Sequence, residues 1–214
     1  MLYLAMKLKT LPEIGSTIVH NNSKYIAFVD VEQDESAENP LHDSDCYGDI
    51  ISLNRRHTSF DAERFSRYCK DKDCVVLSYY EHGECAWAPC AGLTSNCPFD
   101  SVKLAGLWLP NAAITSSLLS PLGKLGGKAR RKQAEKLAAE ACAIYTEWCN
   151  GNVFAYSVVV HRVKVSIYGD TMELLSDYRY ENPIVDENCA GFYLTNKADE
   201  EYLLGQVNQH LENL

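Results

Sequence analysis

The stretch Cys74–Pro110, with the sequence CVVLSYYEHGECAWAPCAGLTSNCPFDSVKLAGLWLP, predicts two apolar strands joined by a polar, cysteine-bearing segment. The first run, residues 74–80, is rich in the β-branched and aromatic residues that favour strands. The second run, residues 103–109, is apolar and ends at Pro110, which has no amide hydrogen to continue a ladder. Because carboxylate, imidazole, thiol and indole side chains gather between the two runs, we expect the first half of a functional site there.

Outside this stretch, the chain predicts more strands than helices. Strand patterns cover residues 23–31, 48–53 and 153–167, and helix patterns cover residues 128–149 and 198–214. The strands do not alternate regularly with helices, as they would in a parallel βαβ chain. We therefore expect a single α+β domain over residues 1–214, with a mostly antiparallel sheet packed by one long helix and shorter helices.

Charge and cysteine content limit the class of protein. The 29 acidic and 20 basic residues give a net charge of −9, so a general attraction to nucleic-acid phosphates is not expected. The sequence has nine cysteines, no basic leader at its start, and no apolar run near the ~20 residues that span a bilayer. These features predict a cytoplasmic protein with reduced thiols, no membrane segment and no cofactor.

Two charged segments are candidates for binding a partner. Residues 30–49 hold eight acids, among them Asp43 and Asp45, and no Lys or Arg. Such a run is typical of a solvated loop, and a cation site or a phosphate-mimicking face is the alternative. The predicted helix at 128–149 begins with a basic cluster that includes Lys128, Arg130 and Arg131. Cations at a helix start oppose the macrodipole, so this cluster indicates either an anionic partner or a solvated basic end.

Polar pairs at both ends of the central segment form the candidate site. Glu81-His82 follows the first predicted strand and Asp100-Ser101 precedes the second. Together with Arg55, Arg56 and His57, they are candidates to line one polar cleft. A carboxylate that orients His82 would give a general base, with Ser101 or a cysteine as nucleophile. The alternative is a buried hydrogen-bond network that fixes a long loop.

The metal-binding interpretation of this segment is weaker. His82, Cys85, Cys90 and Cys97 are possible ligands, but their spacing lacks the CxxC pairs of structural zinc sites. Reduced cysteines packed as small apolar side chains explain the same residues without a metal. We therefore predict no metal site.

Four blocks in a fixed order carry a resemblance to a known family. They are Glu38-Asn-Pro40 followed by Asp43–His57, which ends in Asn54-Arg-Arg-His57; Tyr79-Tyr-Glu-His-Gly83; Asn96-Cys-Pro-Phe-Asp-Ser101 leading to Leu104-Ala-Gly-Leu-Trp108; and Cys149-Asn-Gly-Asn-Val-Phe-Ala-Tyr156 followed by Asn188-Cys-Ala-Gly-Phe-Tyr193. Over residues 38–193 the chain resembles a family of uncharacterised bacteriophage and conjugative-element proteins. That family has an HRRY-like block, Tyr-(Asp/Glu)-His-(Ser/Gly)-Gly, Cys-x-(Trp/Phe)-Asp-Ser and a late Cys-x-Gly-Phe-Tyr. This chain departs from the pattern at His57, which stands in place of Tyr, and at Val102-Lys103, which replaces Gly-Gln.

The resemblance implies a mobile-element setting rather than a reaction. Our first hypothesis is an accessory protein that acts in the cytoplasm of a bacterial host by binding a host macromolecule, in the form of an inhibitor of a host defence system. The alternative is a small hydrolase with Glu81, His82 and Asp100 around one cleft. A third hypothesis is nucleic-acid binding through the basic cluster at residues 124–136. The sequence gives no oligomeric state.

Overall fold

The computed structural model describes residues 7–21, 25–42, 44–90, 100–124, 126–162, 165–168, 171–174, 182–194 and 197–212. Its contacts divide the chain into two compact units. Unit 1 comprises Met1–Ala37 and Gly151–Leu214, and unit 2 comprises Glu38–Asn150. The predicted α+β class with antiparallel sheets is confirmed. Two four-stranded sheets are present in place of the one expected. The prediction of one domain over residues 1–214 stays a prediction.

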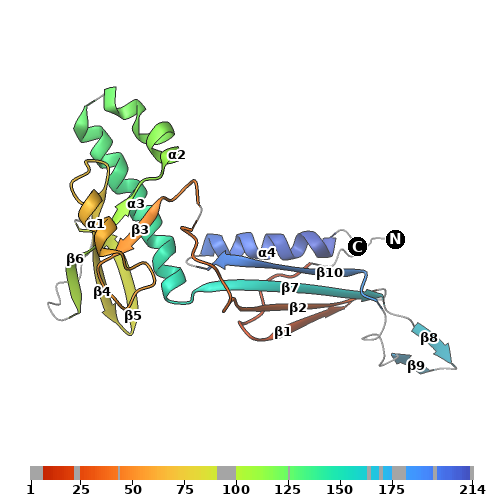
Figure 1. Ribbon diagram of the computed structural model, residues 1–214. Coiled ribbons are helices and arrows are strands. Elements are labelled where there is room, and N and C mark those ends of the chain that lie inside the picture. The colour runs from red at the N-terminus through yellow and green to blue at the C-terminus, as the bar shows by residue number, and fades with distance from the viewer. Residues whose placement is uncertain are drawn as a thin grey trace. The chain divides into compact units, whose positions relative to one another are not determined.

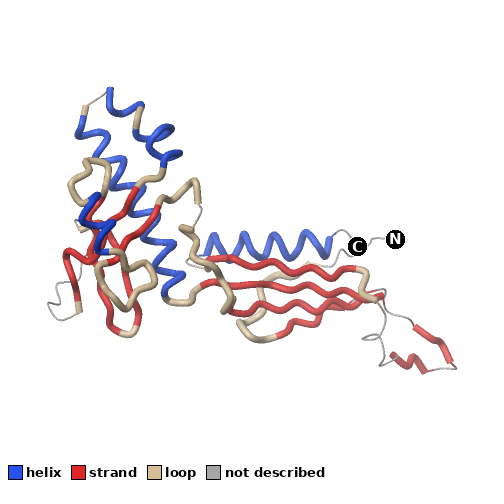
Figure 2. Tube along the Cα trace, viewed as in Figure 1, coloured by secondary structure: helices blue, strands red, loops and turns tan. Residues whose placement is uncertain are grey.

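Unit 1 is an antiparallel sheet with a helix along it (Figures 1 and 2). The strand order is β1-β2-β7-β10, and a separate hairpin pairs β8 with β9. The elements are β1 (Thr17–Asn21), β2 (Tyr25–Gln33), β7 (Val153–Arg162), β8 (Val165–Tyr168), β9 (Thr171–Leu174), β10 (Val185–Tyr193) and α4 (Lys197–Glu212). Alternate residues of β2 and β7 point to one face, where Val29, Val158 and Val160 pack against Leu203 and Val207 of α4.

The N-terminal segment of unit 1 is tied to α4 by one side chain. The Asn208 carboxamide accepts from Leu8 N at 2.7 Å and donates to Leu8 O at 3.1 Å. Asn208 is buried, and the two bonds satisfy both ends of its amide group. This pairing explains why a polar residue stands on the apolar side of α4.

Unit 2 is a second antiparallel sheet covered by helices. Its strand order is β3-β6-β4-β5. The strands are β3 (Asp49–Ser52), β4 (Val75–His82), β5 (Glu84–Pro89) and β6 (Ser101–Leu109), and the helices are α1 (Ala62–Tyr68), α2 (Ala112–Ile114), the π-helical turn η1 (Thr115–Leu119), the 3-10 turn η2 (Pro121–Lys124) and α3 (Gly127–Cys149). The predicted long helix over residues 128–149 is thus confirmed as α3.

The segment between the two predicted strands contains a strand of its own. Gly83 has a φ of 83°, which a glycine adopts without steric cost, and it reverses the chain directly after β4. The following residues form β5, which pairs with β4 from Leu77↔Pro89 to His82↔Glu84. Trp87 is the buried residue of this strand and belongs to the core of unit 2.

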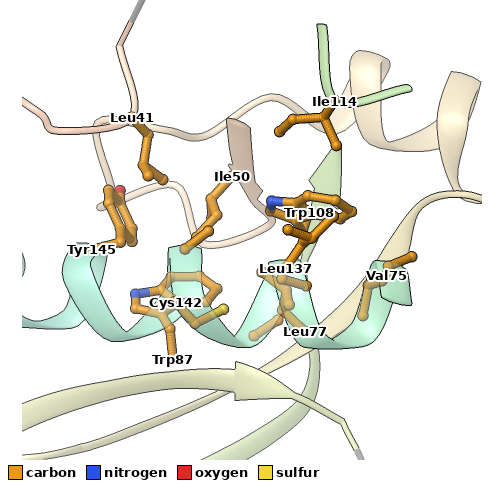
Figure 3. Close-up of a cluster of buried hydrophobic side chains, with 14 of the residues drawn as sticks. Leu41, Ile50, Val75, Leu77, Trp87, Trp108, Ile114, Leu137, Cys142 and Tyr145 are labelled. Atoms are coloured by element: carbon orange, nitrogen blue, oxygen red, sulfur yellow. The ribbon is translucent and has the colours of Figure 1, made fainter. Parts of the chain in front are cut away.

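The core of unit 2 lies between α3 and its sheet (Figure 3). Leu77 and Trp108 are fully buried and meet Leu137, Ala138 and Cys142 of α3. The Trp108 indole donates to Tyr47 O at 2.7 Å, so its polar atom is satisfied within the core. Burying each of these large apolar side chains contributes about 1.5–3 kcal/mol to the stability of the fold.

In the part of the chain that the structure describes, no helix combines the length and apolar character needed to cross a bilayer.

Candidate functional site

The polar pairs predicted to share one cleft divide between two faces of β4. Successive residues of a strand point to opposite faces, so Glu81 lies on the face of Tyr79 and His82 on the other. On the first face, Arg56 lies 4.0 Å from the Glu81 carboxylate. On the opposite face of β4, His82 Nδ1 lies 3.5 Å from Asp100 Oδ2, and the His82 side chain is 74% exposed. The structure therefore brings together Glu81 with Arg56 and His82 with Asp100, as two separate pairs.

A pocket opens on the face that carries Glu81. It encloses about 430 Å³. The lining comes from the loop after β3, the β4–β5 hairpin and the last turn of α3, and it consists of His57, Thr58, Tyr79, Glu81, Gly83, Cys85, Trp87, Tyr145, Trp148, Cys149 and Asn150. Every lining residue belongs to unit 2. We call this cavity the aromatic pocket.

Aromatic rings in mutual contact line much of this pocket. The ring centroids of Tyr79 and Trp87 lie 4.7 Å apart, and those of Trp87 and Tyr145 lie 6.0 Å apart. Tyr145 and Trp148 are stacked, with an interplanar angle of 26° and a centroid distance of 5.5 Å. Tyr79, Trp87 and Tyr145 are buried, whereas Trp148 is only half-buried. Trp148 is therefore the indole with the most surface exposed to a ligand.

His57 is held in place by both ring nitrogens. Nε2 lies 3.2 Å from Asn54 Nδ2, and Nδ1 lies 2.8 Å from Ser52 Oγ. An amide nitrogen can only donate, so Nε2 is the acceptor and Nδ1 carries the proton that Ser52 accepts. Burial lowers the pKa of His57, against the carboxylate of Glu81, which raises it, and Arg56 lowers it further. His57 is thus a neutral ring that packs edge-on against Tyr79 at 4.8 Å.

The lining of the pocket carries one negative charge, which Arg56 at 4.0 Å from the Glu81 carboxylate partly offsets. Among the described residues that line it, Glu81 is the one carboxylate, and neither Lys nor Arg takes part. The Glu81 side chain is 50% exposed, so it reaches solvent at the mouth of the pocket. Burial raises the pKa of the Tyr79 phenol, with further contributions from Cys85 and Glu81. Tyr79 is therefore neutral, and the net charge of the lining at neutral pH comes from Glu81.

Two cysteines face each other at one side of the pocket. The Cys149 thiol at the end of α3 is hydrogen-bonded to Cys85 of β5, and both residues are free cysteines. The Asn150 side chain accepts from Cys85 N at 2.8 Å and donates to Cys85 O at 3.0 Å. Cys149 and Asn150 begin the fourth block of the resemblance, but their contact with Cys85 was not predicted, because positions 85 and 150 are 65 apart and share no local pattern.

The predicted metal ligands do not converge. Cys85 lines the aromatic pocket, Cys90 Sγ donates to Lys103 O at 2.6 Å, and His82 pairs with Asp100. Cys97 lies outside the described residues. Across the described ranges, no group of three or more His, Cys, Asp or Glu side chains is placed to hold a metal ion.

The predicted basic cluster is partly used inside unit 2. Arg130 forms a paired, two-bond contact with the Asp73 carboxylate and donates to Leu119 O at 2.7 Å. Arg131 bonds Glu135 Oε1 at 2.9 Å and Cys74 O at 2.7 Å. Lys128 is exposed on the first turn of α3. Two of the three candidates for an anionic partner therefore have protein partners.

The remaining predicted residues lie at the surface or in a second cavity. Asp45 lines a cavity of about 510 Å³ in which Asp49 forms a 2.6 Å ion pair with Arg64. Asp43 lies outside the described residues. Arg55 is exposed, and Ser101 begins β6 opposite Tyr80. Asp45, Arg55 and Ser101 do not line the aromatic pocket.

No protein-family model matches the chain, and no curated protein or solved structure matches it.

Proposed function

We propose that the chain is an accessory protein of a phage or mobile element that binds a host protein, and that the aromatic pocket receives a basic side chain of that partner. One observation carries the proposal: a pocket lined by Trp148, Tyr145 and Tyr79 has a single carboxylate, Glu81, near its mouth. The mobile-element setting rests on the resemblance of residues 38–193.

A lysine or arginine side chain suits both parts of such a lining. Its methylene stem packs on aromatic rings while its cationic end meets a carboxylate. A cation over an indole contributes about 0.5–2 kcal/mol, the upper value applying when the pair is desolvated. Trp148 is half-buried and Glu81 is half-exposed, so a side chain that enters from solvent can contact both the indole ring and the carboxylate.

The overall charge supports a basic partner. A net charge of −9 attracts positively charged surfaces and speeds their encounter at low salt. The acidic segment at residues 30–49 adds to this field. Host proteins that act on nucleic acids carry such basic surfaces, and a defence protein of this kind is the partner that the inhibitor hypothesis requires.

The hydrolase alternative has less support from the same residues. His57 has both ring nitrogens engaged by Ser52 and Asn54. His82 and Glu81 lie on opposite faces of β4, so they do not act on one substrate atom. The nucleic-acid alternative also has less support, because Arg130 and Arg131 bind Asp73 and the Cys74 carbonyl within the protein.

The pocket is tested with small amides that carry one side chain. N-acetyl-lysine methylamide and N-acetyl-arginine methylamide are titrated against the full chain, with the uncharged norleucine amide as control. The readout is the movement of the indole N–H signals of Trp87 and Trp148 in two-dimensional NMR. We expect the basic amides to shift these signals at concentrations where the norleucine amide does not.

Two variants separate charge from ring contact. Glu81→Gln is expected to weaken binding of the lysine amide roughly tenfold, the value of about 1.5 kcal/mol for a charge-assisted bond. Trp148→Leu is expected to weaken it by up to roughly 30-fold, from about 2 kcal/mol of cation–π attraction. Glu84→Gln is the matched control, because Glu84 is an exposed acid of the same hairpin outside the lining. Equal shifts from the lysine and norleucine amides would contradict the proposal.

The host partner is tested separately. The wild-type chain and its Trp148→Leu and Glu84→Gln variants are used as bait in host lysate, and each candidate is then purified and its affinity measured. Plating efficiency of a phage is compared on defended hosts with and without the chain. A purified partner that loses affinity for Trp148→Leu alone supports the proposal, and unchanged plating on every defended host contradicts the inhibitor form.

A further inference from the structure

The last turn of α3 is fixed against β5 by three hydrogen bonds. Asn150 makes two of them with the backbone of Cys85, and the third runs from Trp87 N to Thr146 Oγ1 at 2.9 Å. Thr146 and Cys149 are three residues apart and so lie on the same side of the helix. Cys149 is thereby held toward Cys85 by contacts that involve neither sulfur atom.

The two thiols are open to small molecules. Both line the aromatic pocket, Cys149 is exposed, and Cys85 is half-buried. Cys74 and Cys142 differ in access, because both are buried in the core, at 5% and 1% exposure. Among the eight cysteines that the structure describes, Cys85 and Cys149 are therefore an accessible pair of adjacent thiols, and the buried thiols serve for comparison.

Cys85 is the better nucleophile of the pair. The hydrogen bond from Cys149 lowers the pKa of Cys85, against burial and the charge of Glu81, which raise it. The same bond raises the pKa of Cys149. Cys149 also ends a 23-residue helix, where the negative end of the macrodipole disfavours a thiolate. The macrodipole of α3 and the hydrogen bond between the two thiols therefore both favour a thiolate at Cys85 over one at Cys149.

We propose that Cys85 and Cys149 are an oxidation site at which hydrogen peroxide forms a disulfide across the side of the aromatic pocket. The Cys85 thiolate attacks one peroxide oxygen, which breaks the O–O bond, gives a sulfenic acid at Cys85 and releases hydroxide. The Cys149 sulfur then attacks the Cys85 sulfur and expels the second oxygen as water. Two thiols lose two electrons and two protons, and one peroxide becomes two waters.

The disulfide alters the lining of the pocket. It joins β5 covalently to the end of α3 and removes both S–H groups, beside the stacked rings of Tyr145 and Trp148. Reduction by dithiothreitol restores the thiols. The oxidation requires no ligand in the pocket, so this proposal can be tested separately from the binding of a basic side chain proposed above.

The test treats the reduced full chain with hydrogen peroxide and maps disulfides by peptide mass spectrometry. We expect one dominant cross-linked peptide pair, containing Cys85 and Cys149, that disappears on reduction. In Cys149→Ser, the sulfenic acid at Cys85 has no resolving thiol and is expected to be trapped by dimedone, at least roughly tenfold more than at the buried cysteines. In Cys85→Ser, dimedone labelling at Cys149 is expected to stay low.

Cys90→Ser is the matched control, since Cys90 is an exposed cysteine directly after β5 whose thiol bonds Lys103 O. It is expected to form the Cys85–Cys149 disulfide at the wild-type rate. Thermal unfolding of each variant shows whether it is folded, and a double Cys85→Ala, Cys149→Ala variant provides a second test if a serine disturbs the fold. A dominant disulfide between other cysteines, or dimedone labelling of Cys149 in place of Cys85, would overturn the inference.

Discussion

Single side chains join distant elements of unit 2, and the Asp73–Arg130 pair is the clearest case. The Asp73 and Arg130 side chains are 10% and 13% exposed, and the guanidinium contacts both carboxylate oxygens. The hydrogen bond from Arg130 lowers the pKa of Asp73, with burial acting in the opposite direction. The pair joins the start of α3 to the turn before β4, positions 57 residues apart.

The lowered pKa of Asp73 predicts a loss of stability in acid. A carboxyl group whose pKa is lower in the folded state than in the unfolded chain stabilises the fold fully at pH values above its unfolded pKa, near 3.8. This stabilisation is lost as the pH falls from there through the folded-state pKa. Asp73→Asn removes it at all pH values and leaves a charged Arg130 without its partner. Urea unfolding followed from pH 7 to pH 3 is expected to show a lower midpoint for Asp73→Asn at pH 7 and a smaller difference at pH 3.

A surface carboxylate provides the control for that measurement. Glu63 pairs with Arg67 across one helical turn, with side chains that are 86% and 62% exposed. Exposed pairs of this kind contribute about 0.3–0.5 kcal/mol, so Glu63→Gln should shift the midpoint slightly. A difference between wild type and Asp73→Asn that stays constant down to pH 3 would show that the carboxylate charge is not what matters.

At the scale of elements, the approach of β6 to β3 depends on one glycine. A Cβ atom built on Gly106 would collide with the Ile51 carbonyl oxygen and would lie 3.0 Å from the Trp87 ring. Gly106→Ala is therefore expected to destabilise unit 2 by about 1–3 kcal/mol or more, since neither a backbone atom nor a packed indole moves easily. Gly127→Ala is the matched control, because a Cβ there meets nothing within 4 Å. Urea unfolding of both variants measures the difference, and equal stability would contradict the packing argument.

Local patterns predict the elements of this protein well and their contacts poorly. The apolar stripe of α3 and the strand at residues 74–80 follow from periodicity within one segment. The expectation of one cleft around Glu81 and His82 conflicts with strand alternation, which places the two side chains on opposite faces of β4. The pairing of Asn150 with Cys85, and of Arg130 with Asp73, joins residues 65 and 57 positions apart. Such contacts depend on tertiary packing, which no local pattern encodes.

At the scale of the whole molecule, unit 2 is an insertion between two neighbouring strands of unit 1. β2 ends at Gln33 and β7 begins at Val153, and the two strands pair along their length up to Gln33↔Phe154. Asp34 N donates to Val153 O at 2.7 Å, and Gln33 Nε2 donates to Gly151 O at 2.6 Å. The chain thus leaves and re-enters unit 1 at one place, which is the arrangement that tolerates an inserted domain.

This arrangement predicts that residues 38–150 fold on their own. The segment is continuous and contains all of β3 to α3, a complete hydrophobic cluster and every residue of the aromatic pocket. We expect the isolated segment to unfold cooperatively in urea and to show the Trp87 and Trp148 indole signals of the full chain. A chain in which a short Gly-Ser linker joins residue 37 to residue 151 should likewise retain the β2–β7 pairing, because the linker spans strands that already touch.

Residues 151–214 alone provide the contrasting case. They supply β7, β10 and α4 but lack β2, so one side of β7 loses its hydrogen-bonded neighbour and Val158 and Val160 lose Val29 from their cluster. An exposed apolar edge of this length promotes aggregation rather than folding. Circular dichroism and size-exclusion chromatography of the three chains should therefore show two folded species and one that aggregates. If the chain is instead one cooperative domain over residues 1–214, residues 38–150 will be unfolded in isolation, and the full chain will unfold in a single transition that removes the pocket signals together with the strands of unit 1.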